Sequence, residues 1–115
     1  MTGKQEVCPR NEVVLALRAR RWSIGKHPKN PSRFFPERVE NPESGLPFTI
    51  SSAVYWLAEE IERGVELKRV ILRKPPGAIA WEIVCPLPPN PQNIYVKFQF
   101  MGGDVVLRSF HLSDV

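Results

Sequence analysis

The chain has 115 residues, of which 43% are apolar and 24% charged, and its formal net charge is +4. This length suits one domain with one hydrophobic core, so we expect a single domain over residues 1–115. No apolar run approaches the ~20 residues that a membrane-spanning helix needs, and charged residues interrupt the N-terminus where a signal peptide would be apolar. A cytoplasmic protein without membrane contact is therefore expected.

The charge is distributed unevenly along the chain. Residues 1–38 carry nine lysines and arginines against three acidic residues, whereas residues 39–115 carry seven against nine. A basic half favours an anionic partner, nucleic acid or an acidic protein, although a solvated basic surface fits the same numbers. Cys8 and Cys85 are far apart and form no metal-ligand spacing with the two histidines. We therefore expect reduced thiols, no metal site and no cofactor.

The N-terminal part is expected to contain a loose tail, a helix and an irregular segment. Residues 1–10 form the tail, and the helix runs from Glu12 to about Trp22, with Asn11 as its N-cap. From residue 23 to residue 47, five prolines exclude a long helix or an internal strand. A long irregular segment of this kind is usually functional or mobile.

Basic and aromatic side chains alternate within this Pro-rich segment. Phe34 and Phe35 are adjacent, and the neighbouring basic residues are Lys26, His27, Lys29 and Arg33. Such a mixture suits phosphate contact combined with base stacking. The alternative is that the two rings only anchor the segment to the core.

An amphipathic helix is predicted over residues 49–63, capped by Thr49 or Ser51 and ended by Gly64. One apolar stripe runs along it, formed by Ile50, Ala53, Val54, Leu57 and Ile61. Tyr55 and Trp56 flank this stripe and are expected in the core or at an interface.

Four strands are predicted after this helix, at about 67–73, 78–85, 93–100 and 105–111. The last two flank Gly102-Gly103, which suits a type I′ or II′ hairpin turn. The expected fold is α+β, with two N-terminal helices packed on a roughly four-stranded antiparallel sheet.

One face of this sheet is predicted to be polar. Tyr95, Lys97 and Gln99 alternate with the apolar Ile94, Val96, Phe98 and Phe100. Glu82 belongs to the more polar set of its strand and is expected beside them. Arg108 could join this face, and so could Arg73 from the first of the four strands.

Such a set can cleave RNA, whose own 2′-hydroxyl is the nucleophile. The reaction needs a base, cations to hold the phosphate, and an acid for the leaving 5′-oxygen. Glu82 is the candidate base, and Tyr95 or His111 the candidate acid. The candidate RNA-binding residues are Arg33, Arg73, Lys97 and Arg108.

The terminal hairpin resembles that of the MqsR-type mRNA interferase toxins. The run Tyr95-Val96-Lys97, a short turn and Val-Val-Leu-Arg-Ser-Phe-His have the order and spacing of that family's pattern. The pair Trp81-Glu82 falls where the family often has an aromatic residue followed by Glu or Gln. Leu46 and Thr49 before an amphipathic helix are also similar, so the resemblance covers about residues 46–114.

The resemblance implies a RelE-like ribonuclease fold and the toxin half of a type II toxin–antitoxin pair. It places the functional positions on Glu82, Tyr95 and His111, with a basic residue at Lys68, Arg69 or Arg73. The 23–47 segment is longer and richer in proline than in the family. Strict alternation also puts His111 on the face opposite Tyr95. A β-bulge, or the position of His111 at the end of the strand, would reconcile the two; without either, His111 closes the edge of the core.

Two functions of different classes follow from the sequence. The first is a metal-independent RNA endonuclease, with RNA as substrate and a cognate antitoxin as partner. The second is a non-catalytic interaction module, a diverged toxin relative that could form a homo-oligomer. The aromatic residues Trp22, Tyr55 and Trp56 would suit its interface.

Overall fold

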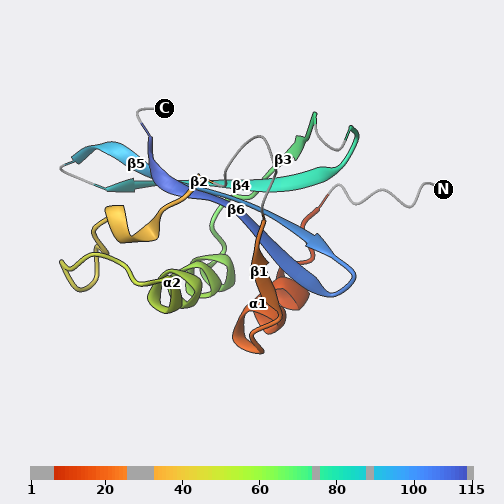
Figure 1. The fold of residues 1–115 in the computed structure, drawn as a ribbon, viewed down its shortest axis with the longest axis horizontal. Helices are drawn as coiled ribbons and strands as arrows, with labels where there is room; N and C mark the ends of the chain where they lie inside the picture. The colour runs from red at the N-terminus through yellow and green to blue at the C-terminus, as the bar shows by residue number, and fades with distance from the viewer. Residues whose placement is uncertain (1–6, 26–32, 74–75, 88–89, 114–115) are drawn as a thin grey trace.

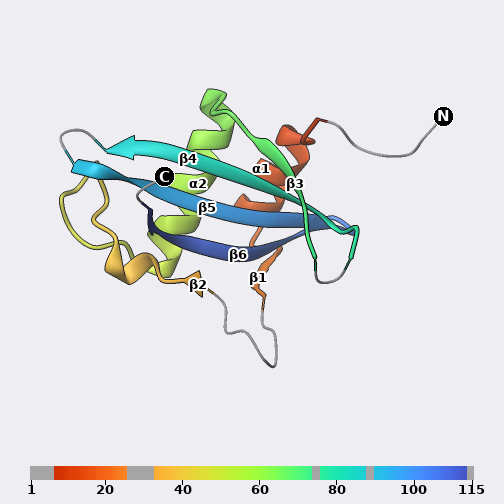
Figure 2. The same cartoon turned by 90° about the horizontal axis from the view of Figure 1, so that it is seen from above.

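The computed structural model describes residues 7–25, 33–73, 76–87 and 90–113. The described residues form a six-stranded sheet, two α-helices and one short 3-10 helix (Figure 1). In chain order, the elements are α1 (Arg10–Arg18), β1 (Trp22–Ile24), β2 (Arg33–Phe34), η1 (Pro36–Arg38), α2 (Ile50–Arg63), β3 (Lys68–Ile71), β4 (Ile79–Leu87), β5 (Asn90–Met101) and β6 (Asp104–Ser113). Both α-helices lie on one side of the sheet, and Figure 2 looks onto the other side, called the outer face below.

The sheet is mixed rather than antiparallel. Its strand order is β1-β6-β5-β4-β3, and β2 also pairs with β6. Strands β3 to β6 form the predicted antiparallel meander, but β1 and β2 both run parallel to β6. The predicted four-stranded antiparallel sheet behind two N-terminal helices is therefore wrong, and so is the RelE-like arrangement that the resemblance implied. Helices and strands still occupy separate layers, as in an α+β protein.

Helix α1 is shorter than predicted, and Trp22 belongs to a strand. The helix begins after Pro9, not Asn11, and closes with backbone bonds from Arg20 to Leu17 and from Arg21 to Ala16. This is the Schellman pattern, in which the residue after the C-cap is left-handed and usually glycine. Here that residue is Arg20, with φ 63°. The reversal lets Trp22 pair with Val105 of β6.

The beginning of α1 is fastened to the end of α2. Cys8 and Arg10 fall in the segment expected to be a loose tail, but Cys8 is buried. The Arg10 guanidinium donates hydrogen bonds to the backbone carbonyls of Ile61, at 3.0 Å, and Val65. These carbonyls lie at the C-terminal end of α2, where a cation is favourable.

The prediction of the second helix is confirmed. Thr49 caps α2 and forms a capping box with Ser52, and Gly64 closes the helix with φ 98°. Ala53, Val54, Leu57 and Ile61 are buried as predicted. Trp56 is buried too, so it is not available for an interface.

The Pro-rich segment is anchored through aromatic packing. Phe34, Phe48, Trp56 and Phe110 form a cluster of edge-to-face rings with centroids 5.1–5.8 Å apart. Phe34 therefore anchors the Pro-rich segment to the core, which was the alternative to a role in base stacking. Phe35 differs, because 36% of its surface is exposed.

The terminal hairpin is also confirmed. Gly102 and Gly103 both have positive φ, 60° and 85°, which is the requirement of a type I′ turn. Ile94, Val96 and Phe98 of β5 are fully buried against the helices, so the other face of this strand is the outer one.

Replacing Phe98 with Ala is expected to lower the free energy of unfolding by about 3–5 kcal/mol, because it removes a fully buried ring from the sheet centre. Urea unfolding monitored by circular dichroism measures the loss. Val70→Ala, at a half-buried position of the otherwise exposed β3, is the control and should cost less. A Phe98→Ala loss below about 1 kcal/mol would contradict this account of the core.

Candidate functional site

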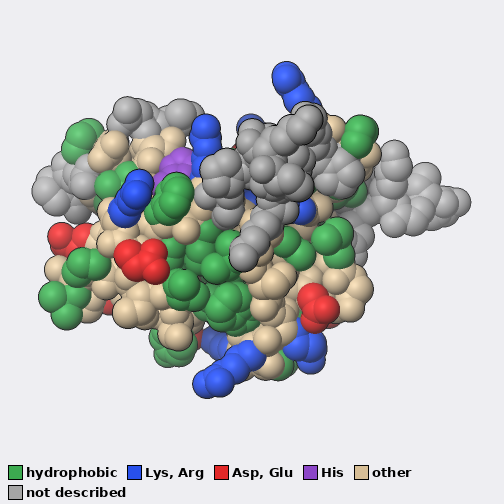
Figure 3. Space-filling model, viewed as in Figure 1, with side chains coloured by type: hydrophobic (Ala, Val, Ile, Leu, Met, Phe, Trp, Pro, Cys, Tyr) green, Lys and Arg blue, Asp and Glu red, His purple; other side chains and the backbone are tan. Residues whose placement is uncertain are grey.

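The outer face carries two adjacent rows of side chains that cross the sheet. One row, called the charged row, consists of residues paired across five strands: Lys68, Glu82, Lys97, Ser109 and Arg33. The next row, called the ring row, consists of Val84, Tyr95 and His111. Both rows line a hollow of about 500 Å³ that Ser113 completes. In Figure 3 the purple histidine lies beside blue basic side chains on this side of the molecule.

A β-bulge in β6 brings His111 to this face. Lys97 pairs with Ser109, whereas Phe98 pairs with Leu107, so Arg108 is an extra residue in β6. Beyond the bulge the alternation is inverted, Phe110 points to the core, and His111 pairs with Tyr95. Of the two ways in which His111 and Tyr95 could share a face, the structure has the β-bulge.

Tyr95 and Glu82 form the central polar contact of the hollow. The Tyr95 hydroxyl donates a short hydrogen bond to the Glu82 carboxylate. Burial, with further contributions from this bond and from the charge of Glu82, raises the pKa of Tyr95 above its ordinary value, while Arg33 acts in the opposite direction. Tyr95 therefore keeps its proton at neutral pH and acts as a donor rather than as a base.

The His111 ring is oriented by its neighbours. Its Nδ1 lies 2.9 Å from the Leu112 carbonyl oxygen, which can only accept, so Nδ1 carries a proton. Its centroid lies 5.2 Å from that of Tyr95, with the planes tilted by 35°. Nε2 is thereby the nitrogen left to exchange a proton with a ligand.

The hollow favours an anion. Three basic side chains, Arg33, Lys68 and Lys97, line it together with one carboxylate, that of Glu82. They come from three different strands and are spread along the charged row across the sheet. Such an arrangement suits a phosphate group above the sheet.

The structure brings together five of the seven predicted site residues. Glu82, Tyr95, His111, Lys97 and Arg33 line the hollow, whereas Arg73 lies in the turn after β3 and Arg108 lies outside the hollow. The sequence left three candidates for the basic residue of β3, and Lys68 is the one that lines the hollow. Ser109 was missed, because simple alternation along β6 places it on the core face.

Arg108 has a structural position at the bulge. Its Nε donates to the Gln99 Oε1 at 2.7 Å, and Gln99 is only 1% exposed. Gly25 leaves room for the guanidinium, because a Cβ there would lie 2.8 Å from Arg108 Nη1. Lys26, His27 and Lys29, also named from the sequence, lie outside the described residues.

The thiols give no reactive nucleophile. Burial raises the pKa of both Cys8 and Cys85 to about 11, so both are protonated at neutral pH. Within the described ranges, no three His, Cys, Asp or Glu side chains are grouped as metal ligands. In the same ranges, no helix is long and apolar enough to span a bilayer.

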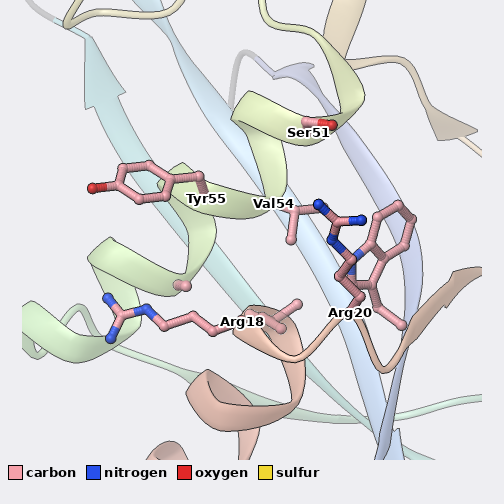
Figure 4. A pocket seen from close by; sticks show the side chains of 8 residues that line it. Arg18, Arg20, Ser51, Val54 and Tyr55 are labelled. Atoms are coloured by element: carbon pink, nitrogen blue, oxygen red, sulfur yellow. The ribbon is translucent and has the colours of Figure 1, made fainter.

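A second hollow, of about 460 Å³, lies on the helical side (Figure 4). Its floor is apolar, formed by Leu17, Trp22, Val54 and Ala58, and its rim contains Arg18, Arg20, Ser51 and Tyr55. Tyr55 and Arg20 lie on opposite sides of Val54 in Figure 4. Tyr55 is 62% exposed, while Arg18 is held by Glu59 and Glu62 at 2.7 Å.

Comparison of the chain with protein-family models, with curated proteins and with solved structures found no match.

Proposed function

We propose that the protein is an endoribonuclease that cleaves RNA on the outer face without a metal ion. The main support is the grouping of Glu82, Tyr95 and His111 beside three basic side chains in one hollow. A carboxylate, an imidazole and cations are the groups that an attack by the RNA 2′-hydroxyl requires. The likeness of the terminal hairpin to MqsR-type toxins supports the same substrate.

In the proposed reaction, Lys97, Lys68 and Arg33 hold the scissile phosphate above the charged row. Glu82 takes the proton of the 2′-hydroxyl, and the 2′-oxygen forms a bond to phosphorus. The bond from phosphorus to the 5′-oxygen breaks, and His111 Nε2–H protonates that oxygen. The products are a 2′,3′-cyclic phosphate and a 5′-hydroxyl. Tyr95 holds the Glu82 carboxylate in place and remains protonated.

We propose that its partner is an antitoxin, as the resemblance to MqsR-type toxins implies. The helical-side hollow offers it an apolar floor and the exposed ring of Tyr55, which suit a protein interface. This surface also supports the second candidate function, a non-catalytic interaction module. Cleavage of RNA distinguishes the two.

Purified protein is expected to cut mixed cellular RNA equally well with and without EDTA, because no step of the reaction uses a metal ion. The measurement is gel electrophoresis, with mass spectrometry of the ends for 2′,3′-cyclic phosphate. Induced expression should also arrest growth. If RNA stays intact and growth is unaffected, the enzyme proposal fails and the interaction module is the better account. Cleavage that disappears with EDTA would refute the metal-free reaction.

A further inference from the structure

Phe35 and Arg38 form an exposed stack next to the hollow that the proposed reaction does not use. The Arg38 guanidinium carbon lies 4.5 Å from the centroid of the Phe35 ring. Arg38 is exposed, and Phe35 is 36% exposed, although its neighbours Phe34 and Pro36 are buried. The Phe35 ring is therefore accessible to a ligand beside the Arg38 guanidinium.

The position of Phe35 follows from the pairing of β2 with β6. Arg33 pairs with Ser109 and Phe34 with Phe110, and the Phe35 amide donates to the Phe110 carbonyl at 2.9 Å. The next residue of β6 is His111, and the next residue after β2 is Phe35. Phe35 therefore extends the ring row at the edge of the sheet. Because Phe34 faces the core, Phe35 points away from it, as Arg33 does.

The flat surfaces of the Phe35 ring and the Arg38 guanidinium are suited to stacking with a nucleobase. Aromatic faces and guanidinium planes are the two surfaces on which unpaired bases stack in RNA-binding proteins. The phosphate-binding cations of the hollow begin with Arg33, two residues before Phe35. Figure 3 shows green apolar and blue basic side chains close to the purple histidine, over β2 and η1. An RNA strand whose phosphate is held in the hollow would therefore present a base to the β2 edge of the sheet.

We infer that Phe35 and Arg38 form a base-stacking subsite for single-stranded RNA, adjacent to the scissile phosphate. This inference rests on the proposed function for its substrate. It makes an unpaired nucleotide part of what the protein recognises. A duplex, whose bases are stacked inside the helix, cannot fill the subsite.

Binding is tested with a fluorescent single-stranded RNA of about ten nucleotides carrying 2′-fluoro groups, which remove the nucleophile. Phe35→Leu is expected to weaken binding by about 5- to 150-fold, the range of one base stack, and Phe35→Trp should retain it. Arg38→Lys keeps the positive charge but loses the planar guanidinium group, and it should weaken binding by a smaller factor than Phe35→Leu does. Leu15→Ala, at an exposed apolar position of α1 on the helical side, is the control and should bind as the wild type does.

A scan of single abasic positions along the same RNA identifies the stacked base. At one position, loss of the base should weaken binding to the wild type but not to Phe35→Leu, because the two changes remove the same contact. Unchanged binding by Phe35→Leu, or a wild type that binds no RNA, would overturn the subsite. If the Phe35 and Arg38 variants weaken RNA binding as expected but the wild type does not cleave natural RNA, the enzyme proposal fails and the subsite stands.

Discussion

Replacing Glu82 with Gln is expected to slow RNA cleavage by about 10²–10⁴-fold, the usual contribution of a group that transfers a proton. The amide has nearly the shape of the carboxylate but cannot take the proton of the 2′-hydroxyl. The neighbouring Tyr95 hydroxyl can still donate to the amide oxygen, so the fold should survive. The measurement is the single-turnover cleavage rate of a defined RNA, with a urea melt to check the stability.

The control for this change is Glu12→Gln, which makes the same chemical substitution at an exposed position in the first turn of α1, on the helical side. It should cleave at the wild-type rate. If Glu82→Gln also cleaves at the wild-type rate while folded, Glu82 is not the base. If both variants lose activity together, the loss reflects net charge rather than proton transfer.

Much of the scaffold around this site was readable from local patterns. The apolar stripe and the closing Gly64 predict α2, and the alternation of Ile94, Val96 and Phe98 predicts the faces of β5. Glu82 was placed beside Tyr95 and Lys97 by the same period-two argument. These features depend on residues close together in the chain, which is why periodicity is sufficient to find them.

The features that were missed depend on distant pairing. Strands β1 and β2 have three and two residues, too few to show a period, and each exists because it pairs with the edge of β6. The end of α1 was missed because Arg20 occupies a left-handed position where glycine would have marked the stop. The bulge at Arg108 has no signature in the sequence, so the face of Ser109 could not be assigned.

Deleting Arg108 is expected to remove the bulge while leaving Phe110 in the core and His111 on the outer face. Leu107 already pairs with Phe98, and Ser109 pairs with the adjacent Lys97, so without Arg108 these pairings follow in continuous alternation. Tyr95 and His111 therefore stay paired, and cleavage should continue close to the wild-type rate. The free energy of unfolding should fall by about 1–3 kcal/mol, because the buried Gln99 Oε1 loses its donor.

Arg108→Lys is the matched control, because it changes the side chain and keeps the register. Lysine can still donate to the buried Gln99 Oε1, so stability and cleavage should stay close to those of the wild type. Urea melts and single-turnover cleavage of both variants make the comparison. If the deletion variant folds but no longer cleaves RNA, the extra residue is needed to position His111 and the register argument fails. If Arg108→Lys loses activity while the deletion variant keeps it, the substituted side chain rather than the register disturbs the site.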